Sequence, residues 1–211
     1  MAITRREYTA FEQAYDFFNQ ALFNGELPPC LITLQRKGRT MGYFSGGRFK
    51  ARSGPGQTDE IALNPDHFTG QPDLEVLDTL VHEMCHLWQH HYGKPSRSGY
   101  HNREWAAKME EVGLMPSSTG KPGGKKSGQR VSDYPIKGGK FLIAAEKLLG
   151  TGFRLNWESV PLSRQKGGSS KRRSKTKYSC PDCGQNAWAK PASNLICGDC
   201  LAAMSPADML T

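Results

Sequence analysis

The sequence predicts an α+β domain followed by a small cysteine-rich module. Apolar residues recur at helical three- and four-residue steps on both sides of short alternating segments, which indicates helices packed on a small sheet. Two Cys-x-x-Cys pairs stand near the C-terminal end. With 211 residues, the chain is long enough for one hydrophobic core and one small module.

One helix is expected before the sheet and two after it. Apolar residues on one side predict the first helix over residues 8–24. Three following segments predict strands: 31–36, 41–50 and 61–64. The second strand is interrupted at Gly46 and Gly47, which is typical of a hairpin partner. Apolar stripes then predict two more helices, over residues 72–92 and 101–112.

The most informative motif lies in the first of these two later helices. His82, Glu83 and His86 form the pattern His-Glu-x-x-His. Histidines four residues apart on a helix point the same way, one turn apart, so both imidazoles can bind one metal ion. Glu83 is placed to take a proton from a metal-bound water. The pattern is typical of zinc hydrolases that use the glutamate as general base.

A catalytic zinc needs a third protein ligand and an open position for water. His90 and His91 lie too close along the same helix for a tetrahedral site that already uses the two histidines of the motif. His101 opens the next predicted helix, after a loop long enough to turn the chain back, and is the preferred ligand. Glu104, one turn further on, remains the alternative.

Four of the six cysteines form two pairs with 13 residues between them. The pairs consist of Cys180, Cys183, Cys197 and Cys200. This spacing is close to that of zinc ribbons, and we expect the four thiolates to hold one structural Zn²⁺. A cytoplasmic chain would rarely use such cysteines as disulfides.

The net charge of +8 is unevenly distributed along the chain. Residues 121–177 contain 15 Lys and Arg against three acidic residues, a balance of +12, so the remainder sums to −4. Such a run is either a solvated linker or a phosphate-binding segment, and the two roles are compatible. The candidate nucleic-acid contacts are Lys171, Arg172, Arg173, Lys175, Lys177 and Trp188.

Five segments are expected along the chain. They are a catalytic domain over 1–115, a flexible linker over 116–135, a small helix–strand extension over 136–162, a basic linker over 163–177 and a zinc ribbon over 178–211. The first linker is expected because the segment is rich in Pro, Gly, Ser and Lys. No apolar run is long enough for a membrane span, and no secretory signal is visible after Met1, so a cytoplasmic protein is expected.

Two stretches of the chain resemble the SprT-like, Spartan-related zinc metallopeptidases. They are His82–Trp88 and Tyr100–Trp105, in which Asn102 stands where the family usually has glycine. The run 18–28 and the segment before the zinc helix are also similar to that family. The resemblance implies a compact zincin-like fold and a zinc-dependent peptidase. In the best-studied members it implies degradation of proteins crosslinked to DNA.

The expected protein is therefore a monomeric zinc peptidase with one catalytic and one structural Zn²⁺. His82, His86 and His101 hold the catalytic ion, and Glu83 is the base. Its expected partners are protein substrates and DNA, single strands included, which it binds without sequence preference. In a bacterium it would be associated with the nucleoid. Two alternatives stay open: a non-catalytic DNA-binding or adaptor protein on the same scaffold, and a peptidase without a nucleic-acid partner.

Overall fold

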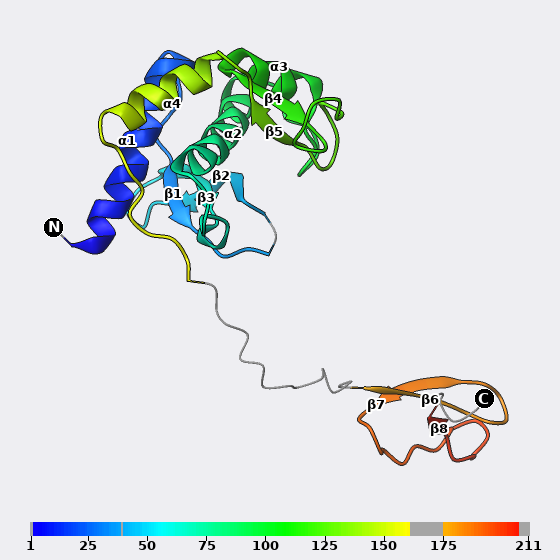
Figure 1. Ribbon diagram of the computed structural model, residues 1–211. Helices are drawn as coiled ribbons and strands as arrows, with labels where there is room; N and C mark the ends of the chain where they lie inside the picture. Colours follow the sequence, from blue (N-terminus) through cyan, green and yellow to red (C-terminus); the bar gives the residue numbers. More distant parts are fainter. Residues whose placement is uncertain (1, 39, 161–174, 207–211) are drawn as a thin grey trace. The chain divides into compact units, whose positions relative to one another are not determined.

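The computed structural model describes residues 2–38, 40–160 and 175–206. The chain divides into two compact units, Met1–Pro161 and Leu162–Thr211 (Figure 1). The first unit is a mixed α+β domain that holds the large hydrophobic core. The second is a small β module that carries the four paired cysteines.

The main sheet of the first unit has the strand order β1-β3-β2. Its strands are β1 (Leu31–Leu34), β2 (Gly42–Lys50) and β3 (Gln57–Leu63). β3 is central, parallel to β1 and antiparallel to β2. The expected hairpin partner is present as β2, but it runs through Gly46 and Gly47 as one strand with a shift of register between Ser45 and Phe49.

Helix α2 lies at the centre of the domain, between the sheet and the other helices (Figure 1). The helices are α1 (Ile3–Phe23), α2 (Asp73–Tyr92), α3 (Arg103–Val112) and α4 (Lys140–Gly150), with a 3-10 turn η1 (Pro65–His67) before α2. α2 follows Pro72, carries acidic residues in its first turn and ends at Gly93, as its sequence predicts. α1 begins at Ile3, five residues before the expected start.

The segment expected to be a flexible linker, 116–135, is instead ordered against the domain. β4 (Leu114–Ser117) and β5 (Ser132–Pro135) form an antiparallel pair. Ser117 and Val131 are buried, and Ser118 donates a backbone hydrogen bond to Lys125 across the loop between the strands. The Gly, Pro and Ser content that indicated flexibility serves tight turns here, which backbone hydrogen bonds hold in place.

The described part of the expected extension 136–162, residues 136–160, also belongs to the first unit rather than forming a separate extension. α4 packs against α1, where the Phe18 and Phe141 rings stack with centroids 5.8 Å apart. The strand expected around residues 153–157 does not form. This stretch runs as irregular chain across the domain, with the Asn156 amide donating to Glu7 and Ser159 bonded to Arg36 and Thr69.

The second unit contains a three-stranded sheet of order β7-β6-β8. Its strands are β6 (Thr176–Ser179), β7 (Asn186–Ala189) and β8 (Ser205–Pro206). β7 and β8 each pair with β6 in antiparallel orientation. Tyr178 on β6 is buried, and its hydroxyl donates to the Lys190 carbonyl. Across both units, no helix among the described residues is long and apolar enough to cross a membrane.

Gly113 at the end of α3 is expected to be intolerant of a side chain. Its φ is +100°, and a Cβ there would lie 2.7 Å from the backbone nitrogens of Lys140 and Phe141. Gly113→Ala should therefore lower the free energy of unfolding by about 1–3 kcal/mol. Denaturant unfolding of the full chain measures this loss.

Gly150→Ala is the matched control for that variant, because a Cβ at this position of α4 meets nothing within 4 Å. Alanine in a helix is favoured over glycine, so this variant should be neutral or more stable by up to about 1 kcal/mol. Equal destabilisation by both substitutions would contradict the proposed tight approach of α4 to the end of α3.

Candidate metal centre

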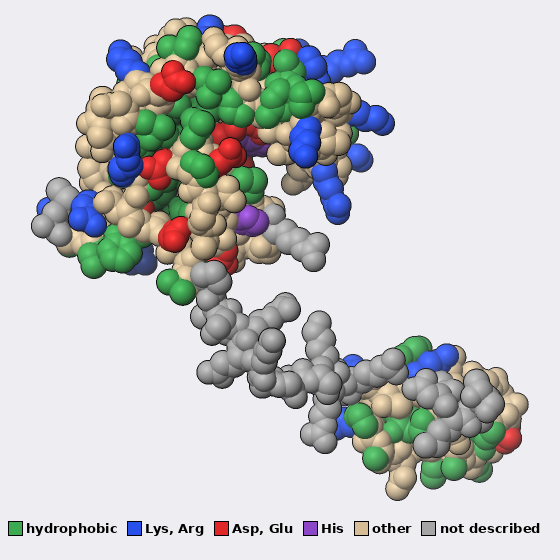
Figure 2. Space-filling model, in the orientation of Figure 1, with side chains coloured by type: hydrophobic (Ala, Val, Ile, Leu, Met, Phe, Trp, Pro, Cys, Tyr) green, Lys and Arg blue, Asp and Glu red, His purple; other side chains and the backbone are tan. Residues whose placement is uncertain are grey.

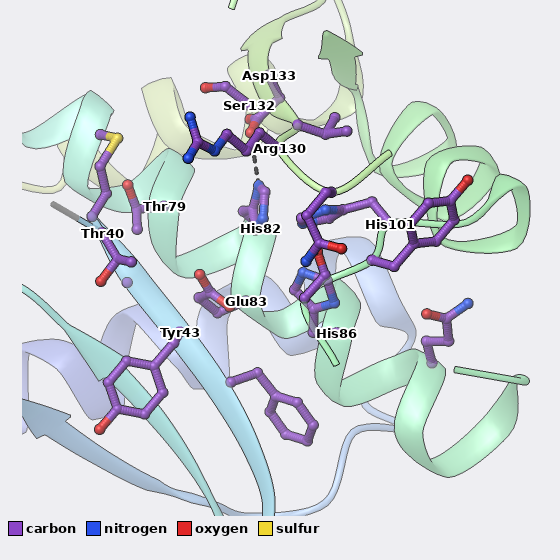
Figure 3. Close-up of a pocket in the computed structure, with 18 of the residues that line it drawn as sticks. Thr40, Tyr43, Thr79, His82, Glu83, His86, His101, Arg130, Ser132 and Asp133 are labelled. Atoms are coloured by element: carbon purple, nitrogen blue, oxygen red, sulfur yellow. Dashed lines mark hydrogen bonds and ion pairs between the residues drawn. The ribbon is translucent and has the colours of Figure 1, made fainter. Parts of the chain in front are cut away.

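Three histidines from two parts of the chain meet above the middle of α2 (Figure 3). His82 and His86 project from successive turns of α2, and His101 comes from the residue pair that precedes α3. One ring nitrogen from each imidazole lies within 4.8 Å of the others. Ring centroids are 5.2 Å apart for His82 and His86 and 4.9 Å apart for His86 and His101.

The segment first expected to be a linker orients two of these three imidazoles. His82 Nδ1 lies 2.8 Å from Asp133 Oδ1 on β5, the contact drawn as a dashed line in Figure 3. His101 Nδ1 lies 3.3 Å from the Gly128 carbonyl oxygen, and the two backbones also exchange a pair of hydrogen bonds. With Nδ1 as the donor in both rings, each Nε2 keeps its lone pair for a metal ion.

The ring of Trp105 packs against the rings of all three histidines. Its side chain is fully buried, and its ring centroid lies 4.9, 5.0 and 4.4 Å from those of His82, His86 and His101. The position of Trp105 depends on Asn102, which caps α3 by accepting a hydrogen bond from the Trp105 amide at 3.0 Å. Asparagine at this position thus starts the helix, which begins at Arg103 and not at His101 as first expected.

The electrostatics of the site favour neutral imidazoles on two of the three histidines. Burial, followed by the charges of the neighbouring histidines, holds the pKa of His86 well below its usual range. Burial and His82 lower the pKa of His101 to about 4. Burial also acts to lower the pKa of His82, but the hydrogen bond and charge of Asp133 outweigh it and raise that pKa.

A buried pair of aspartates supplies the negative charge behind His82. Burial and the neighbouring Asp133 carboxylate raise the pKa of Asp78 well above its usual range, which favours its protonated form. Burial acts to raise the pKa of Asp133 too, but its hydrogen bond with His82 outweighs this effect and lowers it. One carboxylate of the pair therefore stays ionised and faces the metal ligand.

Glu83 lies beside the histidines, at the inner wall of a cleft. Only 5 % of the residue is exposed, and burial raises the pKa of its carboxyl to about 7. The backbone amide of Phe44 on β2 and the neighbouring His82 act in the opposite direction and lower that pKa, but burial outweighs them. A Cβ on Gly42 would lie 2.9 Å from the Ala62 carbonyl oxygen and 3.2 Å from Glu83 Oε1, so glycine at that position leaves room for β2 beside both.

The cleft has a volume of about 670 Å³ and exposes all four residues of the centre. One wall is the stretch Thr40–Phe44, which includes the start of β2, and the other is the loop around Arg97–His101 together with residues 129–133. Figure 3 shows Tyr43 and Glu83 on one side of the space and His101 on the other. Glu83 and the three histidines thus line one continuous open space.

The remaining sequence candidates are used elsewhere in the fold. Glu104, the alternative ligand, accepts hydrogen bonds from Gln89 Nε2 at 2.7 Å and from the Lys94 amide at 2.6 Å. His90 and His91 lie at the C-terminal end of α2, away from the three-histidine group, and gather with Asp59. Sequence reasoning missed Asp133 because it stands 51 residues after His82 in a segment of low complexity.

The four cysteines of the second unit meet in one group, with Sγ atoms within 4.8 Å of one another. Two equivalent turns present them. The Gly184 amide donates to the Cys180 carbonyl and the Leu201 amide to the Cys197 carbonyl, at 3.0 and 2.8 Å. Gly184 and Leu201 occupy matching positions with positive φ, +73° and +57°.

Thiol acidity in this group is compatible with a cation at its centre. Backbone N–H donors from Cys183 and Asp182 lower the pKa of Cys180 to about 7, whereas the neighbouring Cys183 raises the pKa of Cys200 to about 12. Four adjacent thiolates repel one another, and a divalent cation removes that repulsion. The arrangement fits a tetrahedral Cys₄ zinc site.

The candidate nucleic-acid residues divide between described and undescribed parts of the chain. Lys171, Arg172 and Arg173 lie outside the described residues. Lys177 on β6 pairs directly across from Trp188 on β7, and both side chains are exposed, Trp188 by 62 %. Lys175, directly before β6, is exposed as well.

The first unit and its centre define a metallopeptidase-type domain with a His-Glu-x-x-His helix at its core. Residues 11–123 match the SprT-like family, and the chain belongs to this family. A protein of Salmonella typhimurium described as an uncharacterized protein in the mucB 3′ region is 55 % identical over 58 residues. That match covers 28 % of this chain and 78 % of the Salmonella protein.

Asp133→Ala should weaken metal binding at the three-histidine site about 10–100-fold, because His82 loses the partner that orients its ring. The zinc affinity of the three-histidine site, measured by competition with a chelator, reports this change. Ser132→Ala is the control, since Ser132 borders the same cleft without a hydrogen bond to a candidate ligand among the described residues. An unchanged zinc affinity for Asp133→Ala would contradict the positioning role.

Proposed function

We propose that this protein is a zinc-dependent peptidase that cuts proteins associated with or crosslinked to DNA. The single observation that supports catalysis most strongly is the placement of buried Glu83 beside three convergent imidazoles at the wall of an open cleft. A site with only a structural ion has no need of a base beside it. This argues against a non-catalytic adaptor on a zincin-like scaffold.

The residues of the first unit fit Zn²⁺. His82, His86 and His101 supply three nitrogen ligands, which is the usual number at a catalytic site that leaves one position open. Two of these imidazoles are held neutral, the form that binds metal. When bound, zinc supplies an acidified water, with a pKa of about 7 in well-tuned sites, and polarises the scissile carbonyl.

The chain's own residues then carry the proton. Glu83 accepts it from the attacking water and returns it to the amine that leaves. Because burial already raises the Glu83 pKa to about 7, the carboxyl can exist in both forms near neutral pH. The close approach of Gly42 on β2 to its carboxylate restricts its position in the cleft.

Strand β2 is suited to align a peptide substrate. It is an edge strand of the described sheet, paired only with β3 there, and its first residues line the cleft. An extended peptide can add to such an edge through main-chain hydrogen bonds. This mode accepts many sequences, because side chains contribute little to the pairing. It suits a peptidase that acts on diverse proteins.

DNA binding is supported by charge and by one exposed aromatic. Figure 2 shows Lys and Arg side chains gathered over the part of the first unit that holds α3, β4 and β5. Those exposed in the β4–β5 loop and its end are Lys121, Lys125, Lys126 and Arg130. On the second unit, Lys177 beside Trp188 offers a cation next to a stacking surface. Such surfaces bind single strands without reading sequence.

Glu83→Gln should abolish most hydrolysis while preserving zinc and fold, because it removes the base and keeps the shape of the side chain. The expected loss in turnover is on the order of 10²–10⁴-fold. Cleavage of an unstructured basic protein, followed with and without single-stranded DNA, measures it. Zinc content and the melting curve are recorded on the same samples. Turnover at the wild-type rate, or loss of the metal, would refute the assignment of Glu83 as base.

Trp188→Ala in the full chain should weaken binding to single-stranded DNA by about 1–3 kcal/mol, the contribution of one stacked base. Lys177→Ala should reduce the dependence of affinity on salt, with a slope smaller by about 0.7 per lost phosphate contact. Both are measured by salt titration of DNA affinity. Ile196→Ala, which removes a different exposed apolar side chain from the same module, is the control.

Equal DNA affinity in the wild type and in both ribbon variants would mean that these residues of the second unit do not contact DNA. No DNA binding even at low salt would favour the remaining alternative, a peptidase without a nucleic-acid partner. A truncation used in this comparison should end at residue 161, because a cut at residue 120 removes Gly128 and Asp133 from the metal centre.

A further inference from the structure

A second group of metal-binding side chains stands at the C-terminal end of α2, outside the three-histidine centre. It consists of Asp59, His90 and His91, each with one potential ligand atom within 4.8 Å of the others. His91 Nε2 lies 2.6 Å from Asp59 Oδ2. His90 and His91 are not among the ligands of the three-histidine centre. The packing of α2 against β3 places both of them near the carboxylate of Asp59.

The backbone of β2 is shaped around this group. Ser45 pairs with Glu60 and Phe49 with Thr58, so the bulge of residues 46–48 lies opposite the single residue Asp59. A Cβ on Gly46 would lie 2.6–2.7 Å from two atoms of the His90 ring, so only glycine lets that imidazole approach the strand. Bulges of this kind are common beside functional sites.

Asp59 is held in the form and orientation of a metal ligand. Only 6 % of the residue is exposed, and Oδ1 accepts a hydrogen bond from the Gly47 amide at 2.6 Å. Burial acts to raise its pKa, but that hydrogen bond and the two histidines outweigh it, so the pKa is lowered and the carboxylate is ionised. Oδ2 is left to face His91.

We propose that Asp59, His90 and His91 form a second site for a divalent transition-metal ion on the first unit. Two imidazoles and one carboxylate suit Zn²⁺, Co²⁺ or Ni²⁺ and do not suit Mg²⁺ or Ca²⁺, which prefer oxygen ligands. Binding requires the His91–Asp59 pair to open to roughly 3.3 Å, the separation that metal–ligand bonds of about 2.0–2.1 Å set at the tetrahedral angle. Both imidazoles are exposed at a helix end and have room for this change.

An ion at this position would join α2 to β3 beside the bulge of β2, and two of these elements, α2 and β2, border the cleft. Asp59 belongs to β3, the histidines to the last turn of α2, and the bulge to β2. His90 and Phe44 also line the cleft, with ring centroids 5.5 Å apart. The site therefore fixes one end of the cleft wall and lies apart from the residues that carry out catalysis.

Titration of the full chain with Zn²⁺ tests the site. A chain already loaded at the three-histidine and four-cysteine groups should bind one further equivalent, and its melting temperature should rise with added Zn²⁺. His91→Ala and Asp59→Asn should lose both the further equivalent and the rise. In Asp59→Asn the amide oxygen can still accept the Gly47 hydrogen bond, so the fold is retained.

His67→Ala is the matched control, because it removes a histidine from the same unit but outside the group. It should bind the further equivalent as the wild type does. The proposal is overturned if the wild type binds no further Zn²⁺, if His91→Ala binds it equally well, or if His67→Ala loses it as well. The first result would make the His91–Asp59 contact an ion pair only. Since the readout is metal binding, any of these outcomes leaves the peptidase proposal untouched.

Discussion

The hydrogen bond between Asp133 and His82 is the interaction on which the candidate centre depends. It joins β5 to the middle of α2 across 51 residues of sequence, and both side chains are largely withdrawn from solvent. The contact selects the imidazole nitrogen that faces the cleft. It also brings the chain between α3 and β5 close enough for Gly128 to orient His101 in the same way. One segment thus positions ligands that come from two different elements.

Local patterns were enough to predict the parts of the site that a single helix or turn encodes. The helical period placed His82 and His86 on one face of α2 with Glu83 next to the first of them, and the cysteine spacing indicated the two matching turns of the second unit. These features depend on neighbours a few residues apart. The structure brings the side chains together by the same short-range geometry, without help from distant parts of the chain.

The segment 116–135 could not be predicted by the same reasoning. Its composition is that of a linker, and its order comes from partners far away in sequence, namely His82 and His101. A faint signal exists in Val131, which is the first large apolar residue after Met115 and is buried in the structure. Asn102 gave a second signal, since asparagine is a common N-cap and predicts that the helix starts after it rather than at His101.

The charge balance of the centre explains why these particular residues are buried together. Burying an ionised group without a partner is costly, and the shifts in pKa at this site favour neutral His86 and His101 and a protonated Asp78. Asp133, whose pKa is lowered by its hydrogen bond with His82, is the carboxylate paired with that ring. A divalent cation reverses the local preference for neutral carboxyls, because its charge favours the ionised form of a nearby Glu83. The same burial that raises the Glu83 pKa to about 7 therefore makes its protonation respond strongly to the ion. A base whose protonation changes in this way suits a reaction that must both take up and release a proton.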